Sequence, residues 1–212
     1  MTQDKHLNSW QERQELAEAM QPLLGKLFRQ QGVEITVYGR PLLTASTIDI
    51  IKAHRNVRQH TGEKLRLRES FPLLQAITEL NIAQARIDLG KIAIKFAQQH
   101  GTDYDKANEF LSQELSELIG KGEETEPRDV VLYGFGRIGR LLARLLIERS
   151  GQANVMRLRA IVVRGKGGDL EKRASLLRRD SVHGPFNGSI EVDESNNALI
   201  ANGNYIQVIY AN

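Results

Sequence analysis

The sequence contains no cysteine. This absence excludes disulfides, thiolate metal sites and a cysteine nucleophile within these residues. Long hydrophobic runs are also missing, because no apolar stretch approaches the ~20 residues that a helix needs to span a bilayer. The first residues, M-T-Q-D-K-H, lack the apolar core of a signal peptide. We therefore expect no membrane association and a cytoplasmic location.

A strong charge imbalance is missing as well. The 212 residues have a formal net charge of +3, and 41% hydrophobic with 26% charged residues is the composition of an ordinary globular protein. One stretch of the first half is basic, but acidic residues elsewhere nearly balance it and no aromatic residues are interleaved to stack bases. We interpret this cluster as a solvated face and keep phosphate or nucleic-acid binding as the less favoured alternative. Its members are Lys52, His54, Arg55, Arg58, His60, Lys64, Arg66 and Arg68.

Most of the first 120 residues show helical periodicity. The S-x-x-E pattern from Ser9 to Glu12 is typical of a capping box and predicts the start of the first helix. Ser70, two residues before Pro72, predicts another start, because proline is tolerated in a first helical turn. Several apolar stripes of this kind can bury a core, so we expect a helical domain over residues 1–120. The predicted helices span residues 9–32, 44–60, 70–101 and 107–120, and residues 33–38 are predicted to be a short strand or an extended connector.

Two further features of the first half, its histidines and its apolar stripes, do not predict a catalytic or metal site. The histidines His6, His54, His60 and His100 show no metal-ligand spacing and are interpreted as surface residues, so no metal site is predicted. The apolar stripes are interpreted as core, with a subunit or partner contact as the alternative. Residues 121–128, K-G-E-E-T-E-P-R, have the composition of a linker. We expect a domain boundary there, with a second domain over residues 129–212.

The strongest functional signal follows this linker. Residues 130–133 form a short apolar run that predicts a strand, and apolar residues at helical spacing begin at position 138. Between them, Gly134, Gly136 and Gly139 form a G-x-G-x-x-G pattern in the strand–turn–helix context of a dinucleotide-binding fingerprint. The first glycine allows the tight turn, the second allows close approach of a pyrophosphate, and the third allows close helix–strand packing. The free N–H groups of the helix N-terminus favour phosphate, so nucleotide binding is preferred to a purely structural turn.

Residues 157–163 predict a second buried strand. In a Rossmann unit the tip of this strand offers an acidic side chain to the ribose hydroxyl groups of NAD. Here the tip carries Arg164 and Lys166, and a cation there would suit the 2′-phosphate of NADP. The alternative is that Arg164 faces solvent, and the residues leave both interpretations open. Asp169 lies further along the chain as an acidic candidate.

The remaining residues predict a short helix over 169–179 and strands over 189–192, 198–201 and 205–210. Asn202-Gly203 is a strong hairpin signal between the last two strands. His183 is a candidate general base. Because no nucleophile neighbours it in the sequence, we interpret it as a residue that stabilises a turn.

Three segments of the second half together resemble one family. They are Y-G-F-G-R-I-G-R (133–140), R-D-S-V-H-G-P-F-N-G (179–188) and A-N-G-N-Y-I-Q-V-I-Y (201–210). Their order and spacing are similar to those in the amino-terminal part of the NAD-binding domain of glyceraldehyde-3-phosphate dehydrogenase, over residues 128–212. The first half has no counterpart in the ordinary enzyme, so the chain resembles a longer bacterial form with an amino-terminal helical extension. The expected fold class is α/β, with a mainly α-helical amino-terminal domain followed by the first part of a Rossmann-type NAD(P)-binding domain.

The resemblance implies a cofactor and a reaction. It places Phe135, Gly136, Arg137 and Ile138 at the cofactor pyrophosphate. The implied parent enzyme is homo-oligomeric and oxidises glyceraldehyde 3-phosphate to 1,3-bisphosphoglycerate with phosphate and NAD or NADP. The family's ribose-binding Asn-Asp aligns with Val162-Val163, and its adenine-side E-R-D-P segment begins at Ala211-Asn212, so both of these matches fail. The full set of predicted cofactor-binding residues is Gly134, Phe135, Gly136, Arg137, Ile138, Gly139 and Arg164.

The resemblance also implies an incomplete enzyme. The family's nucleophilic cysteine, in an S-x-x-C-T-T-N motif, lies further along than Asn212, so we expect a fragment without catalytic residues and without activity of its own. A close alternative is erythrose-4-phosphate dehydrogenase, which shares these motifs. A second alternative is a non-catalytic, nucleotide-responsive module whose helical half binds a partner.

Overall fold

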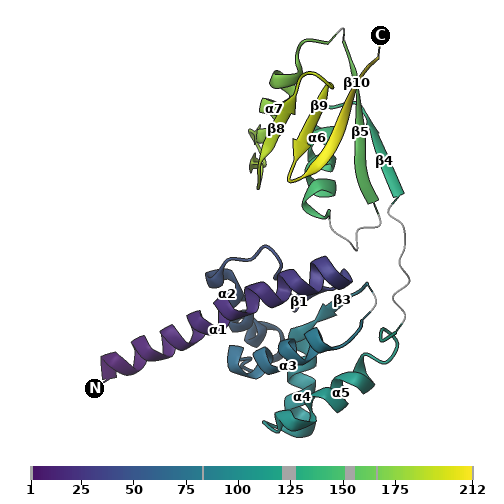
Figure 1. Ribbon diagram of the computed structural model, residues 1–212. Coiled ribbons are helices and arrows are strands. Elements are labelled where there is room, and N and C mark those ends of the chain that lie inside the picture. Colours follow the sequence, from purple (N-terminus) through teal and green to yellow (C-terminus); the bar gives the residue numbers. More distant parts are fainter. Residues whose placement is uncertain (1, 83, 121–127, 151–155, 166, 212) are drawn as a thin grey trace. The chain divides into compact units, whose positions relative to one another are not determined.

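The computed structural model describes all residues except 1, 83, 121–127, 151–155, 166 and 212. The chain forms two compact units, Met1–Glu124 and Thr125–Asn212 (Figure 1). Almost all of the predicted linker, residues 121–128, lies outside the described residues, since only Arg128 at the start of a strand is described. The α/β fold class predicted from the sequence is confirmed.

The first unit is mainly helical. Its small sheet has the order β2-β1-β3, with β1 antiparallel to β2 and parallel to β3. Although α1 has 30 residues, neither it nor any other helix in the described part of the chain is apolar enough to cross a membrane. The elements are α1 (Thr2–Gln31), β1 (Glu34–Val37), β2 (Arg40–Pro41), α2 (Thr47–Thr61), α3 (Leu67–Glu79), β3 (Arg86–Asp88), α4 (Leu89–His100), the 3-10 helix η1 (Tyr104–Lys106) and α5 (Ala107–Glu114).

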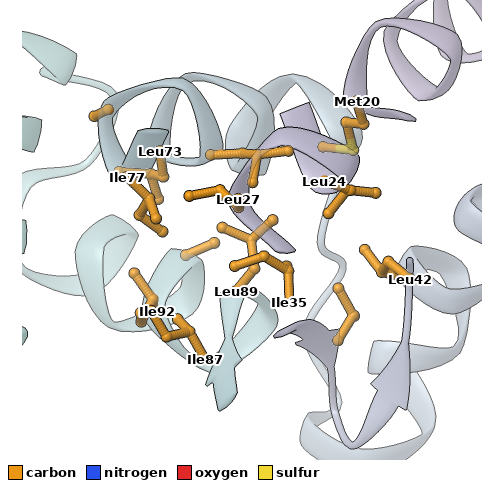
Figure 2. Close-up of a cluster of buried hydrophobic side chains, with 14 of the residues drawn as sticks. Met20, Leu24, Leu27, Ile35, Leu42, Leu73, Ile77, Ile87, Leu89 and Ile92 are labelled. Carbon is orange, nitrogen blue, oxygen red and sulfur yellow. The ribbon is translucent and has the colours of Figure 1, made fainter. Parts of the chain in front are cut away.

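The core of this unit lies between α1, the small sheet and the helices α2 to α5. Figure 2 shows side chains from α1, β1, α3, β3 and α4 that point toward one another. Full burial of one large aliphatic side chain contributes about 1.5–3 kcal/mol, so these contacts hold the elements together. The labelled residues are Met20, Leu24, Leu27, Ile35, Leu42, Leu73, Ile77, Ile87, Leu89 and Ile92.

Two predicted helix starts are wrong. Helix α1 begins at Thr2, so Ser9 lies inside it, because the residues before Ser9 include no helix-breaking glycine or proline. Helix α3 begins at Leu67, three residues before Ser70. The side chain of Glu69 accepts a hydrogen bond from the backbone N–H of Arg66 (2.8 Å), which satisfies a donor at the true start.

The continuous helix predicted through residues 82–96 is also wrong. Residues Arg86–Asp88 form β3, which pairs in parallel with β1, and α4 begins only at Leu89. The carboxylate of Asp88 accepts hydrogen bonds from the backbone N–H groups of Tyr38 (3.0 Å), Gly39 (3.1 Å) and Lys91 (3.1 Å). This one side chain therefore caps α4 locally. It also holds the β1–β2 turn from about 50 residues away, a contact that helical periodicity cannot reveal.

His54 is a buried residue, so its assignment to the surface is wrong. Its side chain is 2% exposed. Ring nitrogen Nδ1 lies 2.8 Å from the carbonyl oxygen of Ile50 and donates to it, and Nε2 lies 2.8 Å from the hydroxyl oxygen of Ser70. Burial lowers the pKa of His54, so the ring is neutral near pH 7. Among the described residues, no group of three or more His, Asp or Glu side chains is arranged to hold a metal ion.

The second unit is built on a five-stranded sheet of order β4-β5-β10-β9-β8. Strands β4, β5 and β10 are parallel, and β9 runs antiparallel to β10 and β8. Helix α6 connects β4 to β5 and contacts both (Figure 1), which is a βαβ unit. The elements are β4 (Arg128–Tyr133), α6 (Arg137–Glu148), β5 (Met156–Arg164), α7 (Leu170–Arg178), β6 (Arg179–Asp180), β7 (Gly184–Pro185), β8 (Ile190–Asp193), β9 (Ala198–Ala201) and β10 (Asn204–Ala211).

The two faces of this sheet differ. Residues such as Ile206 and Val208 of β10 are buried in the core with α6 and α7. Successive side chains of a strand point to opposite faces, so Ile209 belongs to the other face. Register places Ile209 beside Val162 of β5, and Val162 beside Tyr133 of β4. Tyr133 is 76% exposed and Ile209 45% exposed, so an apolar strip remains uncovered on this face.

Candidate dinucleotide site

The candidate site begins where β4 ends. Gly134 has φ +98°, a backbone conformation that side-chain-bearing residues rarely adopt, so the turn requires glycine at this position. Its N–H donates to the carbonyl oxygen of Val162 on β5 (2.8 Å). The chain therefore turns into α6 while still attached to the neighbouring strand, at the carboxyl edge of the parallel sheet, where ligands bind in open α/β folds.

Gly139 allows α6 to approach this turn. A Cβ atom at position 139 would lie 2.3 Å from the carbonyl oxygen of Gly134 and 3.2 Å from its carbonyl carbon. No side chain fits at 2.3 Å from a backbone oxygen. The first turn of α6 is consequently pressed against the glycine loop.

The N-terminus of α6 opens toward solvent. Gly136 is its N-cap residue, so no side chain caps the helix, and its first turn contains no acidic residue. A Cβ atom at Gly136 would meet nothing within 4 Å. The following residues Arg137 and Ile138 are exposed, Ile138 by 76%. An uncapped helix N-terminus with open space before it has the donors and the positive dipole end that fit a pyrophosphate.

Phe135 contributes its backbone rather than its side chain to this edge. Its ring is 8% exposed and belongs to the hydrophobic core with α6, β5 and α7. Its carbonyl oxygen accepts a hydrogen bond from Nη1 of Arg140 (3.1 Å). Gly134 to Gly139 therefore form one turn that leads into α6, and the buried ring of Phe135 anchors this turn in the core.

Arg164 ends β5 at the same edge of the sheet, two residues beyond Val162, the partner of Tyr133. Its side chain is exposed, and its carbonyl oxygen accepts from Nη2 of Arg173 (3.1 Å). Arg173 also forms an ion pair with Asp169 (2.7 Å). Although desolvation raises it, hydrogen bonding to Arg173 lowers the pKa of Asp169 overall, so this carboxylate is ionised and held on α7. Lys166 lies outside the described residues.

Sequence reasoning missed two arginines of α6 that hold the site in place. Arg144 is 6% exposed, and its guanidinium donates to the carbonyl oxygens of Leu177 (3.1 and 2.7 Å) and Gly184 (3.0 Å). Nη2 of Arg140 lies 3.9 Å from the carboxylate of Asp180. The spacing of four residues between the two arginines, which puts them on one helix face, was the available signal.

Asp180 organises the turn of the second motif. Its carboxylate accepts from the backbone N–H groups of Val182 (2.9 Å) and His183 (3.0 Å). These hydrogen bonds lower the pKa of Asp180. The side chain of His183 is exposed, and its backbone takes part in the turn. The segment 179–188 thus packs onto α6 through Asp180 and the Gly184 carbonyl.

The predicted Asn202-Gly203 hairpin is confirmed, with φ of +46° and +79° at the two positions. Both values are positive, as a type I′ turn requires. The side-chain oxygen of Asn202 accepts from the N–H of Ser189 (2.9 Å), and its amide nitrogen donates to the carbonyl of Asn187 (3.2 Å). The third motif therefore ties down the end of the second.

Comparisons with known proteins agree with this architecture. Residues 128–212 match the family described as glyceraldehyde 3-phosphate dehydrogenase, NAD binding domain. A glyceraldehyde-3-phosphate dehydrogenase-like protein of Pseudomonas aeruginosa (strain UCBPP-PA14) is 53% identical over 199 residues, which cover 91% of this chain and 42% of that protein. Because the second unit has far fewer residues than that alignment, the similarity also includes most of the helical unit.

The alignments with more distant relatives are shorter and have about the length of the second unit alone. The glyceraldehyde-3-phosphate dehydrogenases of Shimwellia blattae and Thermotoga maritima are each 39% identical, over 79 and 80 residues, or 37% of this chain. These matches cover 21% and 22% of the two enzymes. The chain thus spans less than half the length of the relatives that it matches.

Proposed function

We propose that residues 128–212, which match the family of glyceraldehyde 3-phosphate dehydrogenase NAD-binding domains, bind a nicotinamide dinucleotide at the glycine turn. The observation that carries the proposal is the uncapped N-terminus of α6 behind Gly134 and Gly136, at the carboxyl edge of parallel strands. In this proposal the backbone N–H groups of Arg137 and Ile138 donate to the pyrophosphate, and Gly136 leaves room for it. The bound cofactor would supply the hydride acceptor for an oxidation.

Replacing Gly136 with aspartate tests this proposal. The backbone at Gly136, φ −73° and ψ −165°, accepts any residue, and aspartate is a favourable N-cap. Its carboxylate would take the N–H groups that the pyrophosphate needs, so we expect NADH affinity to fall at least about tenfold, or ~1.4 kcal/mol. Stability should change by no more than about 0.5 kcal/mol, because glycine and aspartate differ little as N-caps. Calorimetric titration with NADH and urea denaturation measure the two quantities.

The matched control is Gly136→Ala, which adds a Cβ atom into open space and no charge. It should lose less affinity than the aspartate variant, and it should cost at most about 1 kcal/mol of stability, because alanine is a poorer N-cap than glycine. The proposal fails if the wild-type chain binds no NADH, or if the aspartate variant binds it as well as the wild type does.

We further propose that the chain accepts NADP as well as NAD. Arg164 stands exposed at the end of β5, the nearby carboxylate of Asp169 is engaged by Arg173, and Val162 and Val163 offer no acid to the ribose. With no unpaired carboxylate to repel a 2′-phosphate, NADPH should bind within about tenfold of NADH. Arg164→Gln should weaken NADPH binding about tenfold and leave NADH nearly unchanged, measured by the same titration. Equal losses for both cofactors would contradict this role of Arg164.

For the whole protein, we propose phosphorylating oxidation of glyceraldehyde 3-phosphate by a homo-oligomeric enzyme. The support is the family and the uncovered apolar strip of Tyr133, Val162 and Ile209, which the remainder of a larger enzyme would cover. The 212 residues alone should not oxidise an aldehyde, because they include no cysteine to form the thiohemiacetal from which hydride leaves.

A further inference from the structure

The first unit contains a cavity of about 820 Å³ between α1, α2 and the segment that leads into α3. This volume lies within the range of small-molecule sites. Among the described residues, its charged lining is mostly positive: six basic side chains and one carboxylate, that of Glu12, line it. The basic residues are Arg13 of α1, Arg55 and Arg58 of α2, and Lys64, Arg66 and Arg68 of the connecting segment and α3.

Most of these cations are not neutralised by the protein. Arg66 pairs with Glu69 at 3.6 Å, but no ion pair joins Arg55, Arg58, Lys64 or Arg68 to a carboxylate within the described ranges. The net charge of the whole chain is only +3, so the cavity concentrates positive charge that the remaining surface lacks. Like charges gathered around one concave surface raise the local positive potential and attract anions to it.

The uncharged residues that line the cavity indicate which class of anionic ligand it would bind. Leu16, Ile51, Leu65 and Leu67 supply an apolar floor. No phenylalanine, tyrosine or tryptophan is among the described residues that line the cavity, so these residues offer no aromatic ring on which the bases of a nucleic-acid strand could stack. A concave, basic and partly apolar site of this size, open to solvent, suits a small ligand with several phosphate groups. The sequence interpretation of these residues as a solvated face did not foresee that three separate segments gather them around one cavity.

We propose that this cavity binds a small organic polyphosphate, at a second site separate from the glycine turn of the other unit. Arg55 and Arg58 lie one helical turn apart on α2 and provide the main phosphate contacts. Arg13 extends the site from α1, where its guanidinium lies 5.5 Å from the ring centre of Trp10. Trp10 is the only tryptophan of the chain, so its fluorescence reports on ligands that reach Arg13.

Titration of the 212-residue chain with inorganic triphosphate and with ATP, at ~0.15 M salt, tests the proposal. We expect both to change the Trp10 fluorescence and to bind with a dissociation constant of about 0.1 mM or lower in calorimetry. The double variant Arg55→Gln/Arg58→Gln should weaken both at least about tenfold. Both side chains are exposed, so this variant should fold normally.

Three controls separate the possible results. Lys52→Gln/Lys91→Gln removes the same charge outside the cavity and should bind triphosphate like the wild type; an equal loss in both double variants would mean general charge attraction and overturn the proposal. Gly136→Asp should retain triphosphate binding, and the Arg55/Arg58 double variant should retain NADH binding, so failure of either site is recognised independently. Absence of triphosphate binding, or an affinity for single-stranded RNA that exceeds that for ATP and rises with RNA length, would also overturn it.

Discussion

Gly139→Ala should both destabilise the second unit and remove its dinucleotide binding. The added Cβ would lie 2.3 Å from the Gly134 carbonyl oxygen, a backbone atom that cannot rotate away. Overpacking of this kind costs typically about 1–3 kcal/mol, and we expect a value near the upper end. Alanine is a better helix former than glycine by about 1 kcal/mol, which opposes the cost of the clash. A net loss of stability would therefore mean that the clash costs more than this gain. To relieve it, α6 must move from the turn, which displaces the N–H groups of Arg137 and Ile138.

Hydrogen exchange of residues 128–149, followed by mass spectrometry, should show faster exchange in this variant, and NADH affinity should fall more than about tenfold. Gly136→Ala is the matched control, since it makes the same chemical change three residues earlier, where a Cβ atom meets nothing within 4 Å. If the two alanine variants were equally stable, the close packing of α6 on the glycine loop would be refuted.

Arg144→Met should lower the free energy of unfolding of the second unit by about 3 kcal/mol, since hydrogen bonds from a charged donor contribute about 1.5–3 kcal/mol each and are not additive. Methionine fills much of the same space but donates to neither the Leu177 nor the Gly184 carbonyl, and both contacts of α6 with the following segments would be lost. Leu177 lies in the last turn of α7, where the positive guanidinium also stabilises the helix C-terminus.

Urea denaturation followed by proteolysis of the unfolded fraction would measure this change. Arg144→Lys should recover only part of the loss, because an ammonium cannot reproduce the fork of donors. Arg137→Met removes an exposed arginine of the same helix and should change stability by less than about 0.5 kcal/mol. A similar small effect at Arg144 would show that the buried guanidinium does not hold α6 and α7 together.

These two variants separate the roles within the motif G-F-G-R-I-G-R-L-L-A-R. Gly139 sets how closely α6 approaches the turn, and Arg144 sets how the helix is attached to residues 177–184. Arg140 contacts both the glycine turn and the second motif, since it donates a hydrogen bond to the Phe135 carbonyl and lies near the Asp180 carboxylate. The first two family motifs are therefore coupled by direct contacts, and the Asn202 side chain attaches the third.

The sequence by itself determined the features that depend on neighbouring residues. The strand, glycine turn and helix of residues 128–148 follow from apolar periodicity and from a positive φ that only glycine accepts readily at Gly134. The Asn202-Gly203 hairpin is equally local, because the turn type selects these residues. The order of the three motifs indicated the same family whose description matches residues 128–212.

The tertiary structure alone decided the features that depend on distant partners. Strand β3 interrupts a stretch of helical periodicity because β1 offers it a parallel partner. His54 is buried because Ser70, on another helix, satisfies its ring. Arg55, Arg58 and Arg68 read as ordinary solvated charges along the chain, and only the packing of α1, α2 and α3 gathers them around one cavity. Hydrogen bonds and electrostatic interactions act through space, so the structural role of β3, His54 and these arginines depends on residues that are far away in the sequence.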